Sequence, residues 1–109
     1  MGKLENKEME RFYEAVLTLQ TVEECEAFFE DICTIRELMD MSLRLRVAAL
    51  LNSGKAYQEI SKETGASTAT ICRVNRCLVY GDGGYRRVLE RMTHRTEAKT
   101  GGTKNDVCG

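Results

Sequence analysis

The chain contains no proline among its 109 residues. Proline is the residue that most strongly interrupts a helix, and the helix formers Leu, Glu, Ala, Arg and Met are abundant here. The composition therefore predicts an all-α fold. A chain of this length is enough for one domain, but its core is thin and often needs a partner chain.

Long apolar runs are also missing from the sequence. The first twenty residues carry charged side chains throughout, and no apolar stretch approaches the length of a membrane span. We therefore expect neither a targeting segment nor a membrane partner, and we expect the protein to be cytoplasmic.

The chain lacks the residue patterns of metal sites, disulfide frameworks and catalytic sites. It has a single histidine, His94, and five cysteines with no CxxC pair, at positions 25, 33, 72, 77 and 108. Cys72 and Cys77 are five residues apart, which places them roughly 140° apart around a helix. No nucleophile beside a base and no phosphate-binding loop is present. We expect no metal, no cofactor and no enzymatic activity.

The two signs of charge are segregated along the chain, although the net charge is only -1. Residues 1–40 hold 4 Lys/Arg and 11 Asp/Glu, a net of -7, whereas residues 41–95 hold 10 and 4, a net of +6. The last fourteen residues are balanced, with 2 of each sign. This pattern favours an anionic partner for the second part of the chain, although ordinary solvation of the surface is the alternative.

Apolar residues recur at intervals of three and four over most of the chain, which predicts a series of amphipathic helices. The first covers about residues 6–19, and Thr21 begins a capping box for a second. Thr34 begins another capping box for a short third helix, and a fourth runs from about Ser42 to Asn52, where the sequence NSG ends it. Three further segments follow, and the residues after Arg95 lack periodicity.

The residues around Gly65 have the spacing of a helix-turn-helix. Glycine supplies the positive φ that the turn between the two helices requires. Ser61 is small enough for the crossing of the helices, where Ile60, Ile71 and Val74 provide apolar contacts. The alternative interpretation is a plain αα-hairpin in a helical bundle, but that hairpin does not need this combination of residues.

The second helix of the motif has the composition of a DNA-reading element. Ser67 is the expected N-cap, and the short side chains that follow it allow the backbone to approach a groove. We expect base contacts from Thr68, Ala69 and Cys72, and phosphate contacts from Lys55, Ser67, Arg73 and Arg76. A redox switch at Cys72 is a weaker interpretation than a small contact residue.

The stretches FYEAVLTLQTVEECEAFFEDICTIRE, ALLNSGKAYQEISKETGASTATICRVNRCL and YGDGGYRRVLER together resemble the Trp repressor family, in its YerC/YecD branch. The resemblance implies a six-helix, all-α subunit that interlocks with a second copy as an intertwined homodimer on double-stranded DNA. We expect one helical domain over residues 1–92, with dimerisation helices over about 6–52, the helix-turn-helix over about 56–79 and a C-terminal helix over about 83–92. Residues 93–109 are expected to form a disordered tail.

The same resemblance implies an effector pocket beneath the recognition helix, because repressors of this family bind L-tryptophan there. The matching positions hold Arg44, Thr70, Arg73, Val74 and Cys77. Val74 replaces the glycine that leaves room for the indole ring, and Cys77 replaces a serine with a weaker hydrogen-bonding group. We therefore expect that tryptophan is not the effector, and the sequence identifies no other.

Two functions follow from the sequence. The first is a sequence-specific DNA-binding transcriptional regulator, acting as a repressor. The alternative is a dimeric helical module that docks on another protein through its acidic N-terminal half. The salt dependence of binding distinguishes the two functions. Counterion release makes the affinity for DNA fall steeply with ionic strength, whereas a packed protein interface responds less.

Overall fold

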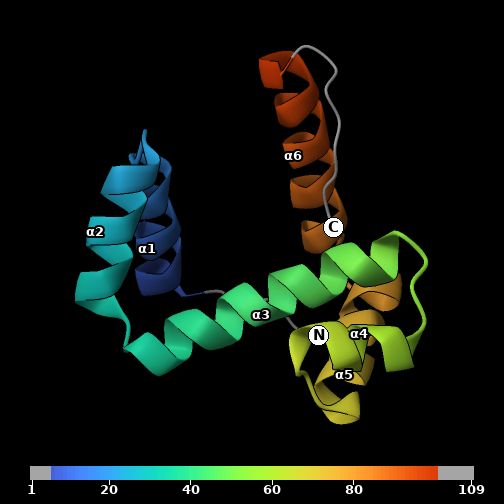
Figure 1. Ribbon diagram of the computed structural model, residues 1–109. Helices are drawn as coiled ribbons and strands as arrows, with labels where there is room; N and C mark the ends of the chain where they lie inside the picture. Colours follow the sequence, from blue (N-terminus) through green and yellow to red (C-terminus); the bar gives the residue numbers. More distant parts are fainter. Residues whose placement is uncertain (1–5, 101–109) are drawn as a thin grey trace. The chain divides into compact units, whose positions relative to one another are not determined.

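The computed structural model describes residues 6–100, and these form six helices joined by short connections, with no strand among the described residues (Figure 1). The helices are α1 Lys7–Leu17, α2 Val22–Ile32, α3 Ile35–Asn52, α4 Tyr57–Thr64, α5 Thr68–Tyr80 and α6 Gly84–Thr100. The all-α prediction and the six helices implied by the family resemblance are confirmed. The chain divides into two compact units, one up to Asp40 and the other from Met41 onward.

The first unit contains α1, α2 and the start of α3. Asn6 caps α1 by accepting a hydrogen bond from the Glu8 amide at 2.7 Å, and Thr21 caps α2 by accepting one from the Glu24 amide at 3.0 Å. The rings of Phe12 and Phe28 stack with their centroids 6.2 Å apart, which joins α1 to α2. No described side chain of this unit is buried.

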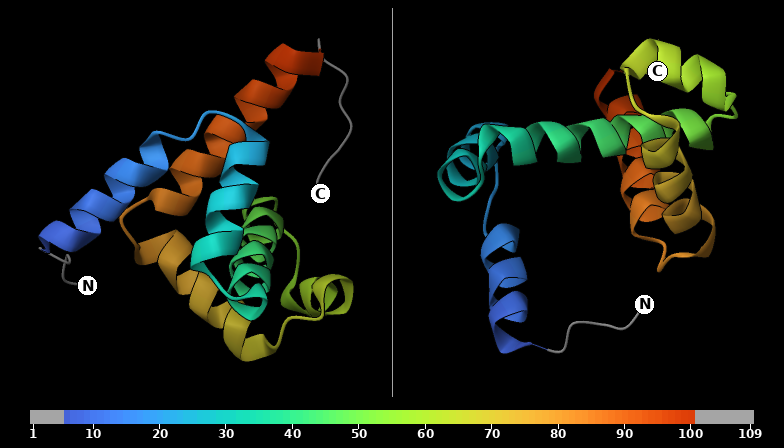
Figure 2. Two further views of the ribbon diagram at one scale, coloured as in Figure 1. Left: turned by 90° about the vertical axis from the view of Figure 1, so that its left-hand side faces the viewer. Right: turned by 90° about the horizontal axis from the view of Figure 1, so that it is seen from below.

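The helix α3 is continuous, so the prediction of two separate helices before and after residue 41 was wrong (Figure 2). Its beginning was predicted correctly, because Thr34 and Glu37 form the reciprocal hydrogen bonds of a capping box. No glycine or proline lies between Thr34 and Asn52, so nothing in the backbone obliges the helix to stop before Ser42. Beyond Asn52 the chain turns at Gly54, whose φ is 93°.

The second unit holds the hydrophobic core of the described residues. The C-terminal half of α3 packs with α4 and α5, and residues of α6 cover the cluster from the side. The buried side chains are Val47, Ala48, Leu50, Ile60, Ala66, Ile71, Val74 and Leu78, with Leu43, Leu51, Tyr85 and Leu89 partly buried against the cluster. No charged or polar residue is buried among the described residues.

The helix α6 extends past its predicted end at residue 92 and reaches Thr100. The prediction of a disordered tail is therefore wrong for residues 93–100, and residues 101–109 lie outside the described part of the chain. The first glycine after Gly84 is Gly101, so the sequence contains no strong helix breaker before that point. At its beginning, α6 is joined to α5 by Arg86, whose Nε donates to the Leu78 carbonyl at 2.8 Å.

Candidate nucleic-acid interface

The turn between α4 and α5 is built by Gly65 and by the hydroxyl groups beside it. Gly65 has a φ of 80°, and its amide donates to the Ser61 carbonyl at 2.8 Å. The Ser61 hydroxyl donates to the Ala66 carbonyl at 2.9 Å, and the Ala66 amide donates to the Thr64 hydroxyl at 3.0 Å. The prediction of a glycine turn is confirmed, and Ser61 also uses its hydroxyl to fix that turn.

The first turn of α5 is closed by Ser67, as the sequence predicted. Ser67 is the N-cap with extended backbone angles, and its Oγ accepts a hydrogen bond from the Thr70 amide at 3.1 Å. The same hydroxyl donates to Thr70 Oγ1 at 3.1 Å. These two contacts fix where the helix begins, and so they fix which residues occupy its exposed N-terminal end.

The two sides of α5 differ sharply in exposure. Ile71, Val74 and Leu78 are buried and hold the helix against the core. Three predicted base contacts and two predicted phosphate contacts on this helix are all exposed: Thr68, Ala69, Cys72, Arg73 and Arg76. Residues four apart lie on the same side of a helix, so Thr68, Cys72 and Arg76 follow one another along a single edge.

The exposed side of α5 also carries one sign of charge. Its thirteen residues, TATICRVNRCLVY, include Arg73 and Arg76 and no acidic residue. The positive end of the helix dipole lies at Ser67 and Thr68 and adds to this field. An exposed, small-residue edge with two arginines and a helix N-terminus suits a polyanion whose backbone must come close.

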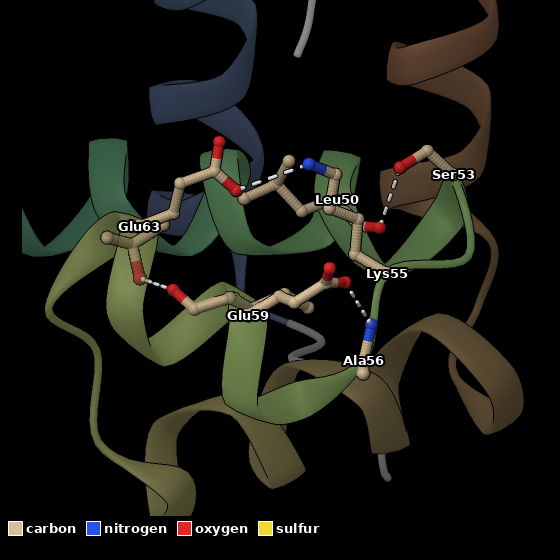
Figure 3. Close-up of polar contacts among 8 residues, drawn as sticks. Leu50, Ser53, Lys55, Ala56, Glu59 and Glu63 are labelled. Atoms are coloured by element: carbon tan, nitrogen blue, oxygen red, sulfur yellow. Dashed lines mark hydrogen bonds and ion pairs between the residues drawn. The ribbon is translucent and has the colours of Figure 1, made fainter.

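Lys55, the other predicted phosphate contact, lies just before α4 and is paired with an acidic residue (Figure 3). Its Nζ is 3.5 Å from Oε1 of Glu63. Glu59 lies nearby and serves a different purpose, since its Oε1 accepts a hydrogen bond from the Ala56 amide at 3.3 Å. The Lys55–Glu63 pair could not be predicted from helical spacing, because Lys55 lies outside the helix.

The residues of the expected effector pocket have different environments. Val74 is only 2% exposed, because its side chain is part of the core cluster. Arg44, Arg73 and Cys77 are exposed, and Thr70 is partly buried. The branched side chain of Val74 therefore fills space within the core, as predicted from its type.

Tyr85 of α6 lies near two of these residues and was missed by the sequence analysis. Burial raises the pKa of its hydroxyl above the ordinary value of 10.0, nearby Cys77 raises that pKa further, and Arg44 lowers it. The structure thus brings together Arg44 of α3, Cys77 of α5 and Tyr85 of α6. Tyr85 and Leu89 are four residues apart and both pack on the core, so helical periodicity could have identified Tyr85 as a core-facing residue.

The described residues, 6–100, show no metal site and no membrane-spanning helix. Within that range no group of three or more His, Cys, Asp or Glu residues is arranged to hold a metal ion. The four cysteines of this range, Cys25, Cys33, Cys72 and Cys77, are free thiols. His94 is exposed and lies 3.9 Å from Glu90. None of the described helices combines the length and apolar character needed to cross a membrane.

Comparisons with known proteins agree with this geometry. The pattern of the family described as Trp repressor protein matches residues 7–93. The chain is 48% identical over 92 residues to the uncharacterized protein YerC of Bacillus subtilis (strain 168), a match that covers 84% of this chain and 88% of that protein.

Two crystal structures are similar to this chain in both fold and sequence. A TrpR-like protein from Eubacterium eligens ATCC 27750 has 47% identity and a TM-score of 0.80, over 83% of this chain and 93% of the other. A candidate Trp repressor from Staphylococcus aureus has 43% identity and a TM-score of 0.79, over 83% of this chain and 90% of the other.

Proposed function

The chain belongs to the Trp repressor family, and we propose that it is a sequence-specific DNA-binding regulator that represses transcription. The observation that carries the proposal is the surface of α5, where an exposed edge of small and basic residues lies opposite a fully buried apolar side. Members of this family are regulators and not enzymes, and we propose no enzymatic activity and a cytoplasmic location for this protein.

In this proposal α5 enters the major groove with its N-terminal end towards the bases. Thr68, Ala69 and Cys72 are short enough to contact thymine methyl groups and base edges directly. Arg73 and Arg76 extend from the same exposed surface and contact phosphates. Ser67 and Lys55 lie at the starts of α5 and α4, where helix N-termini meet the DNA backbone.

We also propose that two copies form an intertwined dimer through residues 6–52. The first unit exposes large apolar side chains that a soluble monomer would normally cover, including Tyr13, Leu17, Val22, Ile35 and Met39. Leu17 is 82% exposed. A second copy would cover these side chains, and a two-fold helix-turn-helix dimer binds successive major grooves roughly 34 Å apart.

DNA binding and its salt dependence test this function. Selection of bound fragments from random DNA should yield a near-palindromic site, because a two-fold dimer presents two equivalent helices. Affinity for that site should fall steeply with salt, with a slope of about -0.9 in log K against log salt for each phosphate contact. If the protein binds no DNA even at low salt, the proposed DNA-binding function is excluded.

The alternative is a dimeric module that binds another protein through its acidic first unit. The exposed apolar residues among the acidic ones of α1 and α2 support it. A packed protein interface responds less to ionic strength than a phosphate interface does. A partner held equally at low and high salt, together with no DNA retention, would favour this second function.

We expect L-tryptophan not to bind. Val74 is packed in the core at the position where the family resemblance implies a glycine that leaves room for the indole ring, and a thiol at Cys77 is a weak partner for an ammonium group. Isothermal titration calorimetry with millimolar L-tryptophan should therefore show no saturable heat. Saturable binding at one site per subunit would contradict the expectation.

A further inference from the structure

The ion pair between Lys55 and Glu63 joins the residues at the two ends of α4. The lysine precedes the helix, the glutamate lies in its last turn, and their side chains are 41% and 43% exposed (Figure 3). A pair this exposed gains little energy in water and is screened by salt. Stabilisation of the fold is therefore a poor explanation for the pair.

The position of Glu63 is also unfavourable for α4 itself. An acidic side chain in the last turn faces the negative end of the helix dipole, where Lys62 is the favourable neighbour. Glu59 differs, because it satisfies the Ala56 amide at the positive end. Of the two glutamates of α4, only Glu59 has an evident role in forming the helix.

The charges around Glu63 cancel. Lys55, Glu59, Lys62 and Glu63 line one open depression of about 350 Å³. With two charges of each sign, this surface has no net charge, whereas the exposed side of α5 has two arginines and no acid. Lys55 is thus a cation at the start of a helix-turn-helix whose charge is already neutralised by the protein.

We propose that Glu63 limits the affinity for DNA by neutralising the charge of Lys55 at the start of the helix-turn-helix. The inference rests on the proposed DNA-binding function. The Glu63 carboxylate, 3.5 Å from the lysine, also repels any phosphate that the lysine contacts. Both effects lower the net gain from the phosphate contact.

The variant Glu63→Gln tests this inference, because it removes the negative charge and keeps the shape of the side chain. Binding is measured by fluorescence anisotropy with a labelled mixed-sequence duplex of about 30 base pairs, since non-specific binding reports phosphate contacts. The variant should bind more tightly at low salt. Its affinity should fall about 3.5-fold further than the wild type between 50 and 200 mM salt for each subunit that gains a contact.

Two further variants distinguish a specific effect of the Lys55–Glu63 pair from the general effect of removing a negative charge. Glu59→Gln removes the same charge from the same depression and keeps an oxygen for the Ala56 amide, so it should raise affinity less than Glu63→Gln. In a Lys55→Gln background only the repulsion between Glu63 and the phosphates remains, so the gain from Glu63→Gln should shrink to about that of Glu59→Gln. The inference fails if that gain is undiminished without Lys55 or if Glu59→Gln in the wild-type background reproduces it. If the wild type does not bind the duplex, the proposed function itself fails.

Discussion

Replacement of Ile71 by alanine is expected to lower the free energy of unfolding by about 2 to 5 kcal/mol. Ile71 is 0% exposed and belongs to a core cluster that, within the described part of the chain, has seven buried residues, including Ile60 and Val47. The substitution removes buried methyl groups and leaves a cavity that so few neighbours cannot close. The total free energy of unfolding of a small domain is about 5 to 15 kcal/mol, so the loss expected for this variant is a large fraction of it.

The measurement is urea denaturation followed by circular dichroism. Wild type and variant are compared at one protein concentration, because the stability of a dimer depends on concentration. Val79→Ala is the control on the same helix, since Val79 is 49% exposed and should change stability by less than about 0.5 kcal/mol. If both variants lower the free energy of unfolding equally, burial in the cluster around Ile71 does not determine the size of the loss.

The double variant Arg73→Ala/Arg76→Ala is expected to lose DNA binding while the fold and the dimer persist. Both arginines are exposed, so their removal leaves no cavity. A hydrogen bond to a charged group contributes about 1.5 to 3 kcal/mol, so the loss of two predicts a fall in affinity of about 100-fold or more. The salt slope should decrease by about 1.8 for each subunit that binds.

The matched control is Arg91→Ala/Arg95→Ala, which removes the same two charges from exposed positions of α6, outside the residues proposed for dimerisation. Electrophoretic retardation and anisotropy measure binding, and sedimentation checks the dimer. The control should retain most of its affinity. A similar loss in both variants would show that overall charge, and not the α5 surface, governs binding.

The features predicted best are those set by residues close together in the sequence. The caps at Thr21, Thr34 and Ser67 each join a hydroxyl to an amide three residues later. Gly65 adopts a positive φ because of its own chemistry, and Ile71 follows from periodicity within one helix. Such features depend on a few neighbouring residues, so one sequence is enough to identify them.

The features that sequence reasoning missed depend on the three-dimensional arrangement or on helix length. A separate helix was predicted to begin at about Ser42, but α3 continues through that residue because no breaker obliges it to stop. The helical extension to Thr100 was missed because the glycines, the charges and the lack of periodicity after Arg95 were interpreted as disorder. The proximity of Tyr85 to Arg44, and of Lys55 to Glu63, depends on how separate segments fold against each other.

The hydroxyl group of Ser67 has a consequence for how water would take part in recognition. Its single proton is donated to Thr70 Oγ1, and one of its lone pairs accepts the Thr70 amide. A phosphate oxygen offers only lone pairs, so it cannot bond to Ser67 unless the contact with Thr70 Oγ1 is given up. A bridging water can donate one proton to Ser67 and the other to the phosphate, and it leaves the cap intact. Contact with the DNA backbone at the start of α5 is therefore expected to be hydrated.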